Sequence, residues 1–411
     1  MGSIYANSEV TFIAAAGDNN AYGLPGVGAT SRRQQHRETV DGIVFLEGFP
    51  HSSEPIKSSE WASRAWTFQE FFFSPRRVIF TDNDVSYLCH GSHRSDTIKV
   101  PLGTHNDFST GLFSDLALSG PRKCQDNWPA WLMEYSRRSL TYDEDALNAF
   151  HGILQYMSTE TNIAHAWGVP IYEDPISLEA MIDINWQHEM PVRRREGFPS
   201  WSYISWAGPM SLTPARARTP LLFTASLGNK ENPILHIAKS LFHSRDKEKD
   251  IEYRYLHLTG YVVELSLTHI KWYRNHRDKM TIVHLPFETE STFTQQPPDA
   301  LYAQLKLTDE VQMLLRVRMD ELNISSREVL LFPLYGKEMD FMYSLVLQPR
   351  GDVYERVGCI AYNFFGEGDP HDPGLIFINS DGQYLDEVDS ELLHCRPLWL
   401  DEAERRTVVV G

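Results

Sequence analysis

The apolar pattern of this sequence changes near Ser200, and this change constrains the fold more than any other feature. Before Ser200, apolar side chains recur at helical spacing over Trp61–Phe72 and Ala146–Met157. After it, apolar and β-branched runs alternate with polar turns, which is typical of strands. The expected strands are Leu256–Leu265, Thr281–Leu285, Glu328–Phe332, Met342–Leu347, Glu355–Ala361 and Leu375–Asn379. The pattern predicts a mixed α+β chain with a helical middle and a β-rich second half.

Strands are also expected in the first half. Val10–Ile13 is a β-branched and aromatic run typical of a short buried strand, and Asp41–Phe49 predicts a second strand. Arg77–Thr81 and Val85–Cys89 flank three Asp and Asn residues, so these two runs predict a hairpin.

The helices of the first half have recognisable ends. Ser59, or the serine before it, can cap the helix that carries the Trp61–Phe72 stripe, and Pro75 ends that helix. Thr141 and Glu144 have the spacing of a capping box, which predicts a second helix directly after them. A third helix is expected near Ser177–Trp186. The region 100–135 predicts a long loop with one short helix.

Composition excludes several classes of partner. Lys and Arg number 38 and Asp and Glu 55, so the net charge of 38 − 55 = −17 repels nucleic acid and anionic membranes. No run of 18 apolar residues is present, and the first residues lack the basic start of a secretory signal. The cysteines have neither zinc nor disulfide spacing; they are Cys89, Cys124, Cys359 and Cys395. We expect a soluble, cytoplasmic protein of two or three domains.

Sequence signatures of common enzymes are missing. The chain has no dinucleotide or phosphate-loop glycine pattern, no nucleophile elbow and no zinc-protease motif. Asp369, His371 and Asp372 fit turn chemistry better than a metal site. The basic run Arg193–Arg195, followed by two tryptophans in FPSWSYISW, fits either a phosphate-binding surface or internal packing, and packing is favoured. No cofactor and no metal are expected.

One polar constellation carries more information than the rest. It surrounds the apolar stripe of the first helix and combines rare residue types at fixed spacing. Its members are Trp61, Arg64, Trp66, Thr67, Gln69, Glu70, Ser74 and Arg76. Two interpretations stay open: a polar cluster at the rim of a pocket, or a structural polar network, which is the one favoured.

The order of the motifs resembles one known family. The segments IYANSEVTFIAAAG, GLPGVG and WASRAWTFQEFFFSPRRVIFTDNDVSYLC are similar to the fungal heterokaryon incompatibility (HET) domain. The segments YSRRSLTYDEDALNAFHGIL and FPSWSYISWAG resemble the region that commonly follows it. The resemblance implies three parts: residues 1–90 from a HET domain, 91–210 as a helical and loop region, and 211–411 as a β-rich domain.

The resemblance implies a role in non-self recognition and programmed cell death, and a TIR-like α/β fold. The chain starts at a point that corresponds to the middle of the family pattern, so we expect the C-terminal half of a HET domain. A coding sequence that begins further upstream is the alternative. Without the leading strands, Val10–Ala14 is expected to form an exposed sheet edge.

Two hypotheses of function follow. The first is a HET-family signalling protein that binds protein partners and has no independent catalysis, no cofactor and no nucleic-acid or membrane partner. The second is a TIR-like NAD glycohydrolase in which Glu70 and Arg64 supply a carboxylate and a ribose or phosphate partner. The resemblance gives no catalytic residue by motif, so the first hypothesis is favoured.

Overall fold

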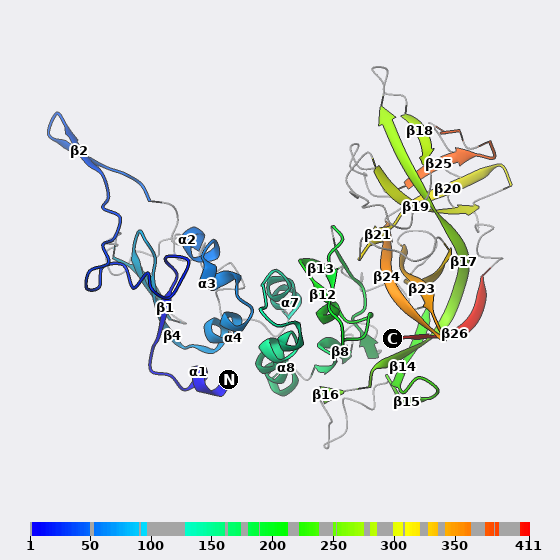
Figure 1. The fold of residues 1–411 in the computed structure, drawn as a ribbon, viewed down its shortest axis with the longest axis horizontal. Coiled ribbons are helices and arrows are strands. Elements are labelled where there is room, and N and C mark those ends of the chain that lie inside the picture. The colour runs from blue at the N-terminus through cyan, green and yellow to red at the C-terminus, as the bar shows by residue number, and fades with distance from the viewer. Residues whose placement is uncertain are drawn as a thin grey trace. The chain divides into compact units, whose positions relative to one another are not determined.

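The computed structural model describes residues 2–49, 53–89, 92–96, 128–160, 163–173, 180–188, 190–212, 222–237, 250–251, 253–274, 280–285, 299–306, 309–320, 328–335, 342–362, 375–381, 383–385 and 403–411. The chain divides into two compact units, Met1–Thr161 and Asn162–Gly411 (Figure 1). The finer division at residues 90 and 210 stays a prediction.

The first unit contains a four-stranded sheet in the order β1-β4-β5-β6. Its strands are β1 (Thr11–Ala14), β4 (Arg76–Phe80), β5 (Val85–Cys89) and β6 (Ser92–Ser95). β1 runs parallel to β4, while β4, β5 and β6 pair antiparallel, as the predicted hairpin requires. β1 ends the sheet order of the described strands, and Phe12 on it is 64% exposed. The expected strand and its exposed edge are both present.

Helices cover this sheet and pack on one another. They are α1 (Gly2–Ala6), α2 (Ser53–Lys57), α3 (Glu60–Ser63), α4 (Trp66–Phe73), α7 (Trp128–Ser136), the 3-10 turn η2 (Asp143–Asp145) and α8 (Asn148–Glu160). Phe71 of α4 joins Ile13 and Ile79 of the sheet in one apolar core. On its other side, α4 meets α8, where the Phe68 and Phe150 rings stack at 6.0 Å. α4 therefore connects the sheet to α8.

The single helix predicted from Ser59 is divided into α3 and α4. Ser59 caps α3 as expected, because its side chain accepts a hydrogen bond from the Ala62 amide. At Arg64 the backbone turns extended, with φ −85° and ψ 133°. The reason is tertiary: Ala65 donates its amide to the Ser139 carbonyl at 2.9 Å, which replaces a helical bond.

The capping box predicted at Thr141 is wrong. Tyr142 takes the cap position of η2 without a side-chain hydrogen bond, and α8 begins only at Asn148. Asp143, Glu144 and Asp145 form η2, which precedes α8. The predicted apolar face is correct, because Phe150, Ile153 and Met157 are buried.

A separate hairpin projects from the first unit (Figure 1). β2 (Arg37–Val40) and β3 (Ile43–Leu46) pair only with each other among the described strands, and all of their residues are exposed. The sequence predicted a strand over Asp41–Phe49 but did not reveal its partner.

The second unit is built around one long strand. β17 (Tyr255–Arg274) pairs antiparallel with five neighbours along its 20 residues. The neighbours are β14 (Phe223–Gly228), β18 (Met280–Leu285), β19 (Asp299–Lys306), β22 (Glu328–Tyr335) and β26 (Glu404–Val410). The sheet continues through β20 (Val311–Arg316), β21 (Arg318–Met319), β23 (Met342–Arg350), β24 (Val353–Tyr362) and β25 (Leu375–Asn379), while β15 (Pro233–His236) pairs with β14.

Strand pairing closes part of this sheet on itself. β17, β22, β23 and β24 follow one another, and β26 joins β24 back to β17. Closure leaves fewer free edges and encloses an apolar core that includes Leu267, Leu331 and Val346. The predicted β-rich second half is confirmed, with six predicted strands in place and β17 longer than expected.

The remaining elements of the second unit are short. These are β7 (Ala164–Ala166), β8 (Val169–Glu173), β9 (Ala180–Ile182), β10 (Trp186–His188), β11 (Arg193–Arg194), η3 (Tyr203–Ser205), β12 (Trp206–Ala207), β13 (Met210–Leu212) and β16 (Asp250–Ile251). The helix predicted near Ser177–Trp186 is wrong, because β9 and the start of β10 occupy its described part. β9 pairs with β8 and β10 with β13, so sheet pairing overrides the local helical pattern.

No helix in the described part of the chain is long and apolar enough to cross a membrane. The loop predicted over 100–135 lies outside the described residues except for α7.

The buried carboxyl group of Asp183 predicts how the free energy of unfolding depends on pH. Burial raises the pKa of its carboxyl group from 3.8 to about 7. The folded chain therefore holds a proton that the unfolded chain releases near pH 4. The free energy of unfolding should fall as pH rises from about 4 to about 7, by at most about 4 kcal/mol. Asp183→Asn should remove this slope in denaturant titrations of the full chain. Asn at the exposed Asp309 is the matched control and should leave the slope in place.

Candidate functional site

The polar constellation predicted from the sequence lies in the first unit, from α3 to the start of β4. Its members differ sharply in exposure. Thr67, Gln69 and Ser74 are buried, whereas Arg64 and Arg76 are exposed. Trp61, Trp66 and Glu70 are half-buried.

Thr67 binds the backbone at the break between α3 and α4. Its hydroxyl lies 2.7 Å from the Trp61 carbonyl and 2.6 Å from the Arg64 carbonyl, and it accepts a bond from Arg138 Nη1 at 3.1 Å. Arg138 stacks on the Phe68 ring at 4.8 Å. Burial lowers the pKa of Arg138, and the carboxylate of Glu134 opposes this effect. The hydroxyl of Thr67 thus holds the chain break and a buried cation together.

Gln69 connects α4 to α8. Its Nε2 donates to the carbonyls of Asn148 at 3.1 Å and Ala149 at 2.8 Å, near the start of α8. Gly152 leaves room for this amide, because a Cβ at that position would lie 2.3 Å from Gln69 Oε1. The WTFQE and NAFHG segments, about 80 residues apart, therefore depend on each other.

Ser74 joins the end of α4 to β1. Its hydroxyl donates to the Glu70 carbonyl at 2.6 Å and lies 2.7 Å from Thr11 Oγ1. Its carbonyl accepts a bond from Arg77 Nε at 2.9 Å. Burial lowers the pKa of Arg77 to about 10. Ser74 thereby links a helix end, β1 and the first residues of β4.

The two residues of the enzymatic hypothesis do not form a pair. Among the described ion pairs, none joins Arg64 to Glu70. Glu70 instead hydrogen-bonds the Tyr5 hydroxyl, and the pKa of Tyr5 is raised first by burial and then by Glu70. Arg76 lies 3.6 Å from the carboxylate of Glu9 at the surface.

The other candidate sites of the sequence are internal or outside the described residues. Arg194 Nη2 donates to the Phe198 carbonyl at 2.7 Å, and Arg195 Nη1 to the Ile204 carbonyl at 2.9 Å. The adjoining tryptophans are buried, so this basic run contributes to packing. The Asp369–Asp372 turn lies outside the described residues. No group of three or more His, Cys, Asp or Glu side chains in the described part can hold a metal ion.

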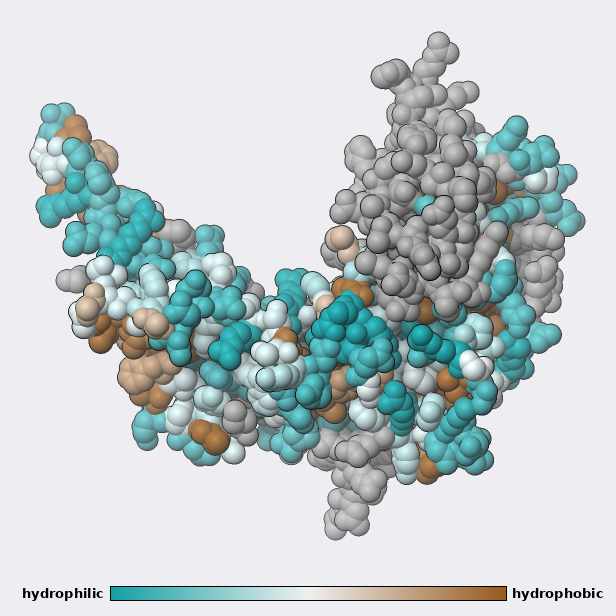
Figure 2. Space-filling model, viewed as in Figure 1, coloured by the Kyte–Doolittle hydropathy of each residue, from teal (hydrophilic) through white to brown (hydrophobic). Residues whose placement is uncertain are grey.

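Exposed apolar side chains concentrate at the front of the chain. Of the fourteen large hydrophobic residues recorded as exposed among the described residues, ten precede residue 47. Five of them belong to the β2–β3 hairpin: Val40, Ile43, Val44, Phe45 and Leu46. Figure 2 shows apolar side chains at the surface of this projecting hairpin. The Asp-Gly dipeptide between two β-prone runs was the sequence signal that could have identified it.

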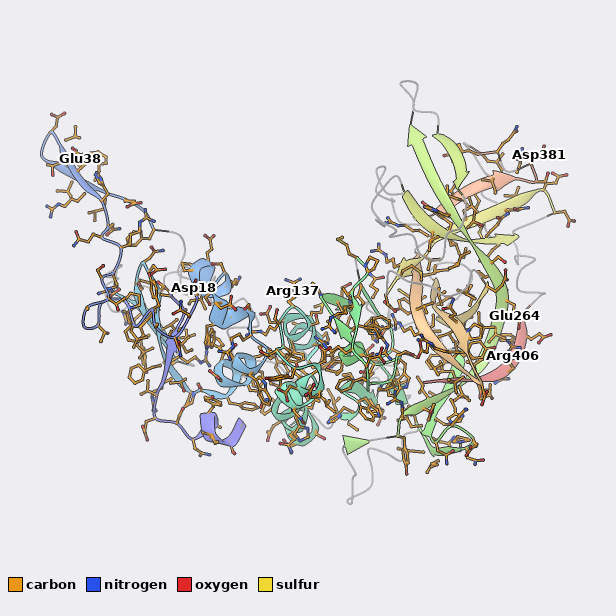
Figure 3. All side chains as sticks on the ribbon, in the orientation of Figure 1. Asp18, Glu38, Arg137, Glu264, Asp381 and Arg406 are labelled. Atoms are coloured by element: carbon orange, nitrogen blue, oxygen red, sulfur yellow. The ribbon has the colours of Figure 1, made fainter. Side chains whose placement is uncertain are left out.

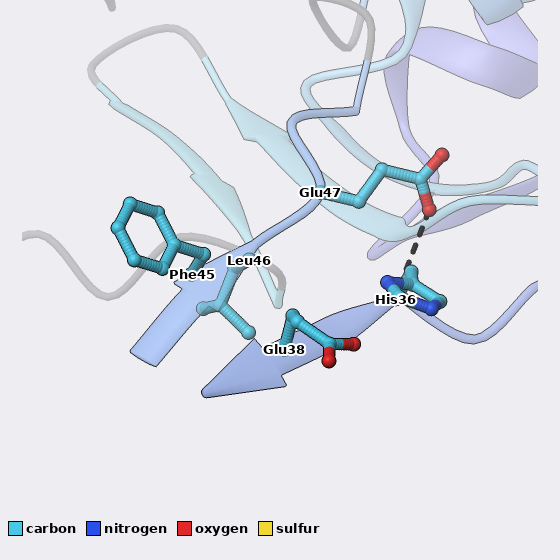
Figure 4. Close-up of a pocket in the computed structure, with 5 residues that line it drawn as sticks. All are labelled: His36, Glu38, Phe45, Leu46 and Glu47. Carbon is cyan, nitrogen blue, oxygen red and sulfur yellow. Dashed lines mark hydrogen bonds between the residues drawn. The ribbon is translucent and has the colours of Figure 1, made fainter. Parts of the chain in front are cut away.

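Charged side chains surround these apolar residues. Figure 3 labels Glu38 on the projecting hairpin, where it pairs with Phe45 across the two strands. His36, Glu38, Phe45, Leu46 and Glu47 line a shallow hollow on the hairpin (Figure 4). Glu47 Oε2 accepts a bond from the His36 amide at 3.2 Å, and its Oε1 pairs with Arg33. The hollow thus combines apolar surface with carboxylates.

Comparison with known proteins places the hairpin and most of the constellation in one family segment. Residues 1–70 match the family described as heterokaryon incompatibility protein (HET). No curated protein and no solved structure matches the chain. The chain therefore contains a HET-family segment over these residues. The matched segment includes the β2–β3 hairpin and ends within α4.

Gln69→Glu tests the link between α4 and α8. The substitution keeps the shape of the side chain but places an acceptor against two carbonyl oxygens, which leaves buried acceptors unsatisfied. We expect a loss of about 2–4 kcal/mol in the free energy of unfolding of the first unit. Gln155→Glu on the exposed face of α8 is the matched control and should change stability by less than about 0.5 kcal/mol. Equal losses in denaturant titrations would contradict the proposed link.

Proposed function

We propose that this protein acts in HET-type non-self recognition and programmed cell death as a signalling component that binds other proteins and has no independent catalysis. Gln69 carries this proposal. It lies in the family-matched segment, and its amide serves the backbone of α8 rather than a ligand. Thr67 and Ser74 are used in the same way. A motif of this kind maintains a scaffold, and the scaffold presents its apolar surface outward.

The connection from β1 to β4 supports a TIR-like α/β fold for this segment. The two strands are parallel, and α2, α3 and α4 lie between them in sequence. Parallel neighbours require such a crossover. The acidic composition and the exposed apolar surface agree with protein partners in the cytoplasm rather than nucleic acid or anionic membranes.

An NAD assay tests the absence of catalysis. Purified full-length protein is incubated with NAD, and nicotinamide release is followed by chromatography. We expect no release above a protein-free control. Release that Glu70→Gln abolishes and Glu60→Gln preserves would overturn the proposal and support the NAD glycohydrolase. Glu60 is suitable as a control because it is exposed on the neighbouring helix α3.

Inducible expression in a filamentous fungus tests the signalling role. We expect the full chain to reduce viability, measured by uptake of a membrane-impermeant dye. Glu70→Gln should preserve the effect, because signalling through binding does not need this carboxylate. Gly152→Val should abolish it, since the added side chain collides with Gln69 and disrupts the first unit. Unchanged viability with wild-type protein at detectable levels would contradict the signalling role.

A further inference from the structure

Strand β3 has the composition of an interior strand but lies at an edge among the strands that the structure describes. Its four residues, Ile43 to Leu46, are apolar and thus present apolar side chains on both faces. A continuous apolar run is typical of a strand covered on both sides. Here the exposed fractions of these side chains range from 44% to 62%. Natural edge strands are commonly protected by lysine, proline or a bulge, and β3 has none of these.

The turn sets the twist and the register of the hairpin. Asp41 and Gly42 both have positive φ, at 50° and 78°. This is the combination required by a type I′ turn, whose twist matches that of paired strands. The turn sets Val40 opposite Ile43 and Thr39 opposite Val44. The hairpin therefore offers a preformed template, although two strands alone are marginally stable in water.

The register of the two strands shows which backbone amides and carbonyls of β3 point outward, where a third strand could pair with them. The Glu47 amide donates to the His36 carbonyl at 2.8 Å, so this pair faces inward between the strands. Because backbone groups alternate along an antiparallel ladder, Val44 and Leu46 direct their amides and carbonyls away from β2. On the opposite edge, Thr39 directs its own groups away from β3. The outer edge of β3 can accept the ladder of a third strand.

The surrounding charges select the partner. Glu38 lies on the same face as Phe45, directly opposite it, and both line the hollow. Arg33 pairs with Glu47, and on the face of Phe45 the charged strand residue is Glu38, whereas Arg37 lies opposite Leu46 on the other face. A lysine can lay its methylene chain on Phe45 and bring its ammonium to Glu38 on the same face. A second copy of this chain would instead bring its own acidic residues and a net charge of −17.

We propose that the outer edge of β3 binds an extended segment of a partner protein, apolar at its centre and flanked by lysine or arginine. The segment adds as a third strand, with hydrogen bonds to Val44 and Leu46 and a basic side chain in the hollow. The inference rests on the proposed signalling role and gives its partner a chemical class.

Peptide binding tests the edge directly. The probe is a fluorescein-labelled eight-residue peptide with four alternating valines and isoleucines between two lysines at each end. Fluorescence anisotropy with purified full-length protein should show saturable binding. Val44→Pro removes an outward amide while keeping the bonds to β2, and should weaken binding about tenfold or more. Thr39→Pro, the same change on the opposite edge, should alter it less than about threefold.

Two further measurements complete the test. A peptide with glutamates in place of the lysines should bind about tenfold more weakly or worse, and Glu38→Gln should reduce this preference. Circular dichroism verifies that both proline variants fold. Absence of binding, equal losses for the two proline variants, or equal affinity for both peptides would each overturn the proposal.

Other occupants of the edge give distinct results. Dimerisation of the wild type that Val44→Pro abolishes would assign the edge to a second copy and overturn the proposal. Displacement of the peptide by phosphatidylcholine vesicles would assign it to a lipid surface and overturn it as well. If Val44→Pro loses peptide binding while the NAD and viability results stand, the proposal is supported. If viability falls as expected but no peptide binds, this inference alone fails and the signalling role remains.

Discussion

The organisation of residues 162–411 depends on one buried cation, the guanidinium of Arg356. The side chain is almost inaccessible to water, and so is the carboxylate of Asp320 that receives its Nε at 2.8 Å. Desolvation disfavours its charge, but the Asp320 carboxylate and Tyr343 outweigh this and raise its pKa. Its remaining donors bind the carbonyls of Ile184 and Trp186, which belong to the segment before the sheet. Removing a partner from a buried charge is strongly destabilising, so these contacts hold the segment before the sheet against β24.

The FPSWSYISW segment is also held in one place, by hydrogen bonds between neutral groups. Ser200 accepts the Arg356 amide at 2.9 Å and donates its own amide to the carbonyl of Gly411. Trp201 and Trp206 each donate the indole N–H to a backbone carbonyl, at 3.0 and 3.1 Å. Large aromatic rings supply buried apolar area, while their single donors require defined acceptors. The tryptophans therefore help specify one arrangement as well as fill the core.

Sequence patterns predicted the elements whose determinants are local. The Arg77–Cys89 hairpin, the Ser59 cap and the buried face of α8 depend on residues a few positions apart, and all are present. One local signal failed, because Tyr142 rather than Thr141 takes the cap position of η2. The other errors arose where contacts outside the local pattern decide. The break at Arg64 is set by Ser139, 75 positions away, and strand pairing converts the helix expected near Ser177–Trp186 into β9 and β10. Among the constellation residues, spacing identified the polar members but not the carbonyls that they bind.

In the family-matched segment, polar motif side chains are buried and apolar side chains of β3 are exposed, which is the reverse of the usual arrangement. Its polar motif residues turn inward and bind carbonyls, as Thr67 and Gln69 do, while apolar residues of β3 turn outward. Each arrangement carries a cost: burying a polar group requires a fixed partner, and exposing an apolar strand requires protection from aggregation. The inward polar groups give a rigid framework, which can hold an exposed edge without letting the whole unit rearrange around it. Binding of a partner strand at β3 would then relieve the second cost, so the exposed apolar strand favours recognition by strand addition.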